Sequence, residues 1–246
     1  MSRIEMQIQE LKDQVTLCFV DENRWQFIVD GLLMTFKITL GALVLGLVIG
    51  ILLSIIRSAH DQIGKKALQG PGGLLLRLLN GAAKLYLTVI RGTPTLVQLL
   101  LMYFVFLKDW DNKVSVAILS FGINSGAYVA EIFRSGIMSI DKGQMEAGRS
   151  LGLGYVKTMQ KIILPQAFKN TLPALVNEMI TLFKETSISG YIGLNELTRG
   201  GNIIQSATFS PFLPLMAVAV IYLAIVMFIT WIMGLIERRL RESDRR

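Results

Sequence analysis

The feature that most constrains this chain is a run of nineteen residues without a charge, from Ile38 to Ile56. An α-helix rises about 1.5 Å per residue, so this run is about 28 Å long, close to the thickness of the hydrocarbon core of a bilayer. A second uncharged run extends from Phe212 to Ile236. Two such runs in one chain argue against an ordinary soluble domain and predict a helical membrane protein.

The composition agrees with this prediction. Hydrophobic residues make up 52% of the chain and charged residues only 17%, whereas soluble domains carry about 25% charged residues. The net charge of +7 would suggest nucleic acid as the partner of a soluble chain, but in so apolar a chain it predicts contact with anionic lipid. A single cysteine, Cys18, and a single histidine, His60, leave no disulfide, histidine-based triad or multi-histidine metal site to build. No catalytic residue and no metal ligand are predicted.

The apolar segments predict one membrane domain, 25–240, between a polar N-terminal extension, 1–24, and a basic tail, 241–246. We expect the extension to include a surface helix. The predicted spans are 27–56, 85–107, 114–140, 171–192 and 212–236. The fourth is the weakest, because it carries Glu178, Lys184 and Glu185, and charges inside a membrane are costly. A re-entrant or interfacial helix is the alternative for this segment.

The loop charges predict the orientation. The connections 57–84 and 141–170 and the end of the chain are rich in Lys and Arg, while the other two connections are nearly neutral. The positive-inside rule then places the N-terminus outside and the C-terminus inside. This alternation requires five spans, which supports 171–192 as one of them. The predicted fold class is an all-α polytopic membrane protein with about five transmembrane helices.

The most patterned connection is the loop at about 141–168. It reads E-A-G-R-S-L-G from Glu146 to Gly152 and ends on I-I-L-P at 162–165. A glycine after Leu151 and a proline where the next span begins predict two short helices joined by a tight turn. Such a helix-turn-helix would form a rigid surface for docking a partner. An inert amphipathic loop on the membrane surface is the alternative.

Several motifs together resemble the permease subunits of bacterial ATP-binding-cassette (ABC) importers, and more narrowly their polar amino-acid branch. The resemblance covers about 31–240 and is carried, in the family's order, by R-G-T-P at 91–94, A-Y-V-A-E-I-F-R at 127–134, the loop signature at 146–152 with I-x-L-P, and K-E-T-S at 184–187. Gly148 departs from the family, which usually has alanine there. Because glycine inside a helix costs roughly 0.5–1 kcal/mol relative to alanine, we expect a looser helix at this position.

The resemblance implies ATP-driven import by alternating access in a bacterial cytoplasmic (inner) membrane. The implied partners are two cassette ATPase subunits, a second permease copy that is either identical or paralogous, and an extracytoplasmic amino-acid-binding protein, with no nucleic acid. No cofactor is implied on this chain; ATP and Mg²⁺ belong to the partner ATPase. The loop would sit in a cleft of the ATPase, and its implied coupling residues are Glu146, Ala147, Gly152, Ile162, Leu164 and Pro165.

Polar residues inside the predicted spans are candidates for the substrate pathway, because a zwitterionic amino acid needs partners for both of its charges. The candidates are Arg91, Glu131, Asn177, Glu178, Thr186 and Ser187. Pairing of Glu131 with Arg134, three residues further along a helix, is the structural alternative. For Glu178 the alternative is pairing with a membrane cation such as Lys37 or Lys184.

Two other classes of function compete with the importer. An independent ion-coupled secondary transporter of small polar solutes would predict internal inverted repeats, and no repeat is evident in the sequence. A membrane scaffold without transport activity would leave the charges inside the spans unexplained.

Overall fold

The computed structural model describes residues 3–62 and 70–243, and the described residues form helices and connections without a β-strand. The α-helices are α1 (Arg3–Val15), α2 (Trp25–Gln62), α3 (Pro71–Arg91), α4 (Thr95–Leu101), α5 (Lys113–Met138), α6 (Lys142–Ser150), α7 (Tyr155–Thr158), α8 (Leu164–Glu185), α9 (Leu197–Thr208) and α10 (Phe212–Ser243). Short π- and 3₁₀-helical segments join some of them. The predicted all-α class is confirmed.

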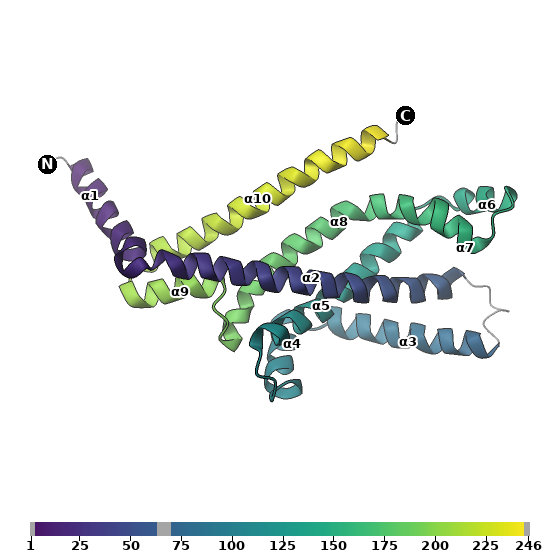
Figure 1. Ribbon diagram of the computed structural model, residues 1–246, viewed down its shortest axis with the longest axis horizontal. Coiled ribbons are helices and arrows are strands. Elements are labelled where there is room, and N and C mark those ends of the chain that lie inside the picture. The colour runs from purple at the N-terminus through teal and green to yellow at the C-terminus, as the bar shows by residue number, and fades with distance from the viewer. Residues whose placement is uncertain (1–2, 63–69, 244–246) are drawn as a thin grey trace.

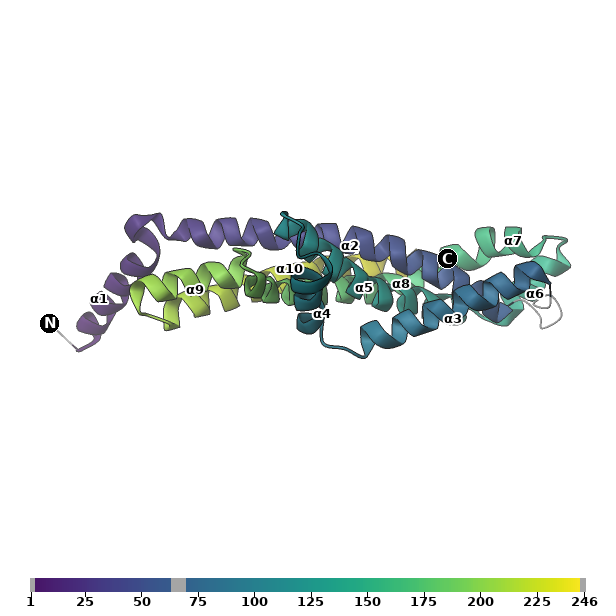
Figure 2. The ribbon, with the colours of Figure 1, turned by 90° about the horizontal axis from the view of Figure 1, so that it is seen from below.

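The molecule is elongated, and its long helices run along the long axis. In Figure 1, α1 and α9 lie at one end and α6 and α7 at the other. Figure 2 shows α2 and α3 side by side toward the end that carries α6 and α7. Among the described residues, four helices are long and apolar enough to cross a membrane: α2, α3, α5 and α10. The most apolar stretch of α5 is 61% buried and that of α10 only 11%, so α5 is the centre of the fold and α10 its periphery.

The second predicted span, 85–107, is not one continuous helix. It is divided at Gly92–Pro94, where α3 ends and α4 begins, and α4 continues as a π-helix over Met102–Phe106. The physical reason is Pro94, which lacks a backbone N–H and disfavours helical geometry in Thr93. The helix that is long enough to cross a membrane is α3, which begins at Pro71. Most of the predicted loop 57–84 is therefore helical, and 63–69 lies outside the described residues.

The fourth predicted span is occupied by α8 and a 3₁₀-helix, Thr186–Ile192. Helix α8 begins at the I-x-L-P motif with Pro165 in its first turn, directly after a π-helical turn, Met159–Ile163. Because Pro165 has no backbone N–H to donate, it lies where the π-helical hydrogen-bond pattern changes to the α-helical one. Helix α8 is 22 residues long, but it is not among the four helices apolar enough to span. The charged residues that weakened the prediction for this segment, Glu178, Lys184 and Glu185, also lower the hydropathy of α8.

Close packing between α2 and α5 forms the core of the domain. The G-x-x-x-G pair Gly46 and Gly50 lies against α5, where a Cβ on Gly50 would approach the backbone nitrogen of Ala130 to 2.9 Å. Small residues allow such close backbone contact in membrane helices. Beside this contact, Ile38 of α2 and Phe121 of α5 are fully buried in a cluster with Leu182 of α8. The helices that carry the polar residues are thus held at fixed distances.

The N-terminal extension forms a helix that is attached to the domain at its end. Helix α1 has no buried residue, whereas Cys18, which follows it, is fully buried beside α2 and α9. The guanidinium of Arg24 donates to the carbonyl oxygen of Leu17 at 2.6 Å and to the Glu22 carboxylate at 2.8 Å. Residues 16–24 therefore anchor an otherwise exposed α1.

Helix α9 is capped by a buried carboxylate. Glu196 is 1% exposed, and its carboxylate accepts the backbone N–H groups of Thr198 at 2.7 Å and Arg199 at 2.8 Å. An N-cap of this kind satisfies donors that the helix leaves free. The N–H of Leu197 donates to the Thr35 hydroxyl of α2 at 3.2 Å, so the start of α9 is bound to α2.

Glu196 predicts a pH dependence of stability. Burial raises the pKa of its carboxyl from 4.5 to about 7, although the capping hydrogen bonds and the charge of Arg199 oppose the rise. Because the folded state keeps a proton that the unfolded state releases, this contribution to stability is complete below about pH 4.5 and is lost as the pH rises through about 7. We expect the unfolding temperature of the full chain in detergent to fall over this range, and to fall less in Glu196→Gln. Identical profiles would contradict this assignment.

Candidate functional site

The connection between α5 and α8 is a compact helix-turn-helix, as predicted. The Asp141 carboxylate begins α6 by accepting the N–H of Gly143 at 2.6 Å. At the other end of α6, the N–H of Leu153 reaches back to the carbonyl of Gly148 at 3.0 Å, and Gly152 adopts a φ of +80°. This is the left-handed geometry that commonly ends a helix and that glycine adopts without strain. The turn reverses the chain into α7.

Gly148 does not loosen the loop, contrary to the expectation from its sequence. It is buried against Thr158 of α7, and a Cβ on Gly148 would lie 2.8 Å from the Thr158 hydroxyl oxygen and 3.2 Å from its Cβ. Thr158 is itself fully buried. The missing side chain therefore lets α6 and α7 touch, and the propensity cost of glycine is offset by the packing that it permits.

The tip of this loop is exposed and apolar at the far end of the molecule (Figure 1). Leu151 is 80% exposed and Val156 is 62% exposed. Of the predicted coupling residues, Glu146, Ala147, Gly152, Leu164 and Pro165 are exposed, and Ile162 is half-buried. Ile163 instead packs into a cluster with Ile137 of α5 and Ala167 of α8. The loop thus has a buried base, which joins it to the long helices, and an exposed tip.

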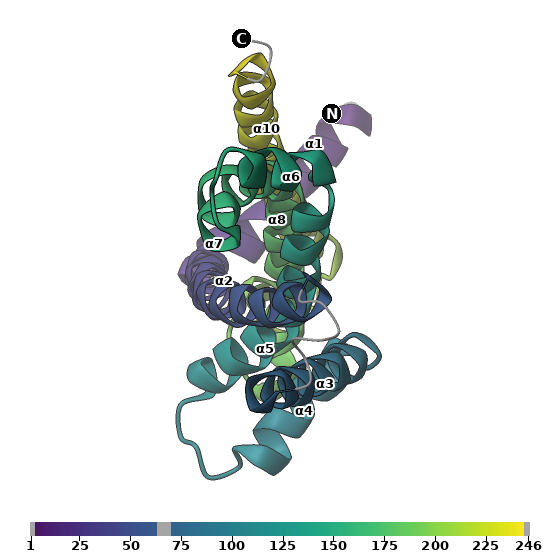
Figure 3. The ribbon, with the colours of Figure 1, turned by 90° about the vertical axis from the view of Figure 1, so that its right-hand side faces the viewer.

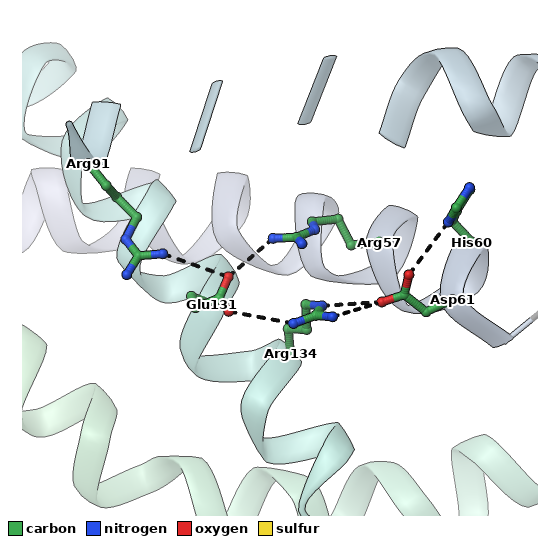
Figure 4. A network of polar contacts seen from close by, with 6 residues as sticks. All are labelled: Arg57, His60, Asp61, Arg91, Glu131 and Arg134. Atoms are coloured by element: carbon green, nitrogen blue, oxygen red, sulfur yellow. Dashed lines mark hydrogen bonds and ion pairs between the residues drawn. The ribbon is translucent and has the colours of Figure 1, made fainter. Parts of the chain in front are cut away.

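A second polar feature is an ion-pair network between α2, α3 and α5 (Figure 4). The carboxylate of Glu131 lies 3.1 Å from Arg57, 3.6 Å from Arg134 and 3.9 Å from Arg91. Arg134 also contacts Asp61 at 3.0 Å. One carboxylate is therefore shared by three guanidinium groups from three helices.

The network includes Arg134, which the sequence predicted as a partner of Glu131, and two residues that the sequence did not indicate, Arg57 and Asp61. Arg134 lies three residues after Glu131 on the same helix, so spacing alone could identify this pair. Arg57 and Asp61 lie about seventy residues before their partners, at the end of a helix that the sequence analysis ended at residue 56. The only feature of the sequence that could have linked Arg57 and Asp61 to this network is their charge, and both residues lay in the predicted connection 57–84.

The other pathway candidates lie on α8 and the 3₁₀-helix after it. The Glu178 carboxylate accepts a hydrogen bond from the Ser125 hydroxyl of α5 at 2.7 Å, and Asn177 beside it is exposed. Thr186 is buried and donates to the carbonyl of Phe183 at 2.7 Å, and Ser187 is half-buried. No ion pair of Glu178 with Lys37 or Lys184 occurs within the described part of the chain.

The candidates therefore form two groups rather than one site. Arg91 and Glu131 belong to the network at α3, and the remaining four belong to α8 and its extension. Figure 3 shows α3 and α8 on opposite sides of the molecule, with α2 and α5 between them. Exposed polar residues form a row along α8 at helical spacing: Asn170, Asn177, Thr181 and Lys184. The sequence did not predict this row, because which face of α8 is exposed depends on how the helices pack.

Comparison with known proteins agrees with this architecture. Residues 72–242 match the family described as "Binding-protein-dependent transport system inner membrane component". The arginine transport system permease protein ArtQ of Bacillus subtilis is 38% identical over 89% of this chain and 94% of its own length. The glutamine transport system permease protein GlnP of Escherichia coli K12 is 37% identical over 87% of this chain and 93% of its own length.

Solved structures share the fold. A chain in the crystal structure of an amino acid ABC transporter with histidines is 37% identical, with a TM-score of 0.76, and the match covers 90% of this chain and 98% of that one. A chain of the inward-facing methionine transporter MetNI superposes with a TM-score of 0.70 at 20% identity, covering 89% of this chain and 98% of that one. The second likeness concerns the fold alone.

The multi-pass helical fold and these matches define the class as a membrane transport subunit. The chain belongs to the family of binding-protein-dependent transport system inner membrane components. Within it, the chain is a permease subunit of an amino acid ABC importer, which confirms the resemblance of its motifs.

Proposed function

We propose that this chain imports polar amino acids by alternating access, driven by a separate ATPase that docks on the loop around 146–165. The observation that carries this proposal is that the loop has an exposed apolar tip and a buried base. Its tip exposes apolar side chains such as Leu151, while its base is packed against α5 and α8. A partner that moves the tip would therefore move those helices as well, and so shift the population of two transport states.

The proposed complex contains two ATPase subunits, which bind ATP and Mg²⁺, a second permease copy and an external amino-acid-binding protein, in a bacterial cytoplasmic membrane. The polar row on α8 supports the second permease copy. Polar side chains within membrane segments face protein or a water-filled cavity rather than lipid, and this row is exposed on the single chain. A second copy, identical or paralogous, would enclose the row and create an aqueous pathway.

Glu178 is the acidic candidate for the substrate ammonium group in that pathway. It is held by Ser125 at 2.7 Å, and Asn177 beside it is exposed and half-buried Ser187 follows further along the chain. Thr186 is fully buried and would face the pathway only in another transport state. Lys184, one turn and a half further along α8, is exposed and offers a positive charge for a carboxylate. Arg91 and Glu131 contribute to transport through the helix network rather than through direct contact with the substrate.

The experiment that tests this function begins with the tagged chain purified in mild detergent together with every protein that it retains. The preparation is reconstituted in liposomes, and uptake of labelled arginine, glutamine and histidine is measured with and without ATP on the loop side. We expect an ATPase to co-purify and uptake to require ATP. Uptake by the chain alone under a proton or sodium gradient would instead establish a secondary transporter.

Thr181 tests the pathway assignment. It is exposed on the polar row of α8, and Thr230 is exposed on α10, so the two threonines form a matched pair on different surfaces. We expect Thr181→Leu to lower ATP-driven uptake roughly ten-fold, because loss of one hydrogen bond to substrate or to ordered pathway water costs about 1–1.5 kcal/mol. Thr230→Leu should leave uptake unchanged. Equal effects of the two variants would remove α8 from the pathway.

A further inference from the structure

A pocket of about 530 Å³ lies beside the ion-pair network and is lined by residues of α2, α3 and α5. Its charged lining consists of three cations, Arg57, Lys84 and Arg91, and one carboxylate, Glu131. Glu131 is already shared with Arg134. The pocket therefore has more positive charge than its own carboxylate can neutralise.

Two of these cations have unused donors. The Nε of Arg57 is buried and has no hydrogen-bond partner within the described part of the chain, although Nη1 of the same side chain contacts Glu131 at 3.1 Å. Lys84 makes no ion pair with any described residue. The exposed ammonium group of Lys84 is therefore free to bind an anionic oxygen in the pocket, whereas the Nε of Arg57 is closed off from solvent and Arg57 contributes its positive charge only.

The position of the pocket along α2 suggests where the anion comes from. Arg57 is the first charged residue after the uncharged run Ile38–Ile56, and this run spans about one hydrocarbon core. Arg57 therefore lies at the depth of the lipid headgroups. The pocket is lined by residues of α2, α3 and α5 but by none of α8, and α3 and α8 lie on opposite sides of α2 and α5 (Figure 3). The pocket is therefore separate from the proposed substrate pathway.

The surface next to the cations is apolar. Leu85 and Val89 follow Lys84 and Thr88 directly along α3, and they are 66% and 51% exposed. Side chains one residue apart on a helix lie on adjoining faces, so a row of exposed apolar groups flanks the cationic row. A soluble anion would make no use of this surface, but the acyl chains of a lipid would cover it.

We propose that this pocket binds the phosphodiester headgroup of an anionic phospholipid. The phosphate oxygens accept from the ammonium group of Lys84 and from the guanidinium of Arg91, whose side chain is 44% exposed, while Arg57 adds positive charge. The acyl chains lie along Leu85 and Val89. Basic pockets between membrane helices are a known way of recognising such headgroups. The lipid would also bridge α2 and α3, whose connection includes the residues outside the described ranges.

The test measures lipid binding to the full chain, purified with the subunits that it retains, by native mass spectrometry. Phosphatidylglycerol and phosphatidylcholine with identical acyl chains are titrated against the unmodified protein, Lys84→Gln and Lys84→Arg. Arg77→Gln is the matched control, since Arg77 is an exposed cation two turns earlier on α3 and does not line the pocket. Lys84 is exposed, so its variants are expected to fold, and their unfolding temperatures without lipid verify this.

We expect phosphatidylglycerol to bind more tightly than phosphatidylcholine. Lys84→Gln should lower the affinity for phosphatidylglycerol about five-fold, because one cation near an anionic surface contributes about 1 kcal/mol. Lys84→Arg and Arg77→Gln should retain the affinity of the unmodified protein. Equal affinities for the two lipids, or equal effects of Lys84→Gln and Arg77→Gln, would overturn the proposal. Displacement of phosphatidylglycerol by inorganic phosphate, with the same dependence on Lys84, would also overturn it, because the pocket would then be a site for a soluble anion.

Discussion

Replacing Gly200 by valine is expected to destabilise the chain by about 3 kcal/mol, at the upper end of what overpacking usually costs. Gly200 lies on α9 against the first turn of α2, where a Cβ would clash with the carbonyl oxygen of Phe27 and approach its carbonyl carbon to 3.0 Å. A side chain could rotate away from such a contact, but a backbone carbonyl inside a helix cannot. Helix α9 would therefore have to move away from α2.

The measurement is the unfolding temperature of the full chain in detergent, which we expect to fall by roughly 10 °C, since each kcal/mol shifts it by about 2–4 °C in a protein of this size. Gly234→Val is the matched control, because nothing lies within 4 Å of a Cβ at Gly234 on α10. Both variants put a β-branched residue in a helix, so propensity cancels in the comparison. Equal shifts in the two variants would show that α9 does not rest on α2 through Gly200.

Replacing Gly148 by alanine is expected to lower ATP-driven uptake roughly ten-fold while membrane insertion stays normal. The new methyl group would collide with the buried side chain of Thr158 and force α6 and α7 apart. Overpacking of this kind costs about 1–3 kcal/mol, and a loss of about 1.4 kcal/mol in docking free energy is a ten-fold change. Uptake into liposomes by the reconstituted complex, at equal amounts of inserted protein, is the measurement.

Thr158→Ala provides the compensating change. It removes the two atoms of Thr158 that would meet the new methyl most closely, so the double variant Gly148→Ala, Thr158→Ala should recover most of the uptake. Non-additivity of this kind is the mark of residues in direct contact. If the double variant is as inactive as Gly148→Ala alone, the loss does not arise from the contact between α6 and α7.

The helices that agree with the sequence analysis are those whose pattern is continuous and local. The uncharged run Ile38–Ile56 lies within α2, and the run from Phe212 begins α10 at the predicted residue. The helix-turn-helix was predictable for the same reason, because a glycine at the turn and a proline at the start of α8 act on their immediate neighbours.

The errors arose where hydropathy and backbone geometry disagree. The segment 85–107 is apolar throughout most of its length, but α3 ends within it, just before Pro94, and a second helix begins after the proline. Leu74 to Ala83 belongs to one helix with the residues after it. The amphipathic pattern of this stretch predicts an interfacial helix that leads into the span at 85–107, so its helical state was predictable and the bounds of the helix were not. Hydropathy measures burial in lipid or protein, whereas the course of a helix depends on backbone hydrogen bonds.

The polar sites show a similar division. Spacing along one helix indicated that Glu131 would meet Arg134, but its contact with Arg57 joins residues 74 positions apart. For Gly148, helix propensity alone predicted a looser loop. The contact with Thr158 explains why a residue without a side chain fits at this position. A preference that belongs to one residue can be predicted locally, while a contact depends on which segments the fold brings together.

The sequence by itself determined that this chain is a helical membrane protein, which of its runs are apolar and long enough to cross a bilayer, and that its motifs belong to an importer permease. These properties follow from composition, from 3.6-residue periodicity and from turn residues, all of which act over a few positions. Only the tertiary structure decided that Glu131 is shared by three helices, that Gly148 joins α6 to α7, and that one face of α8 is polar and exposed. Each of these depends on helix packing, which brings together side chains that are distant along the chain.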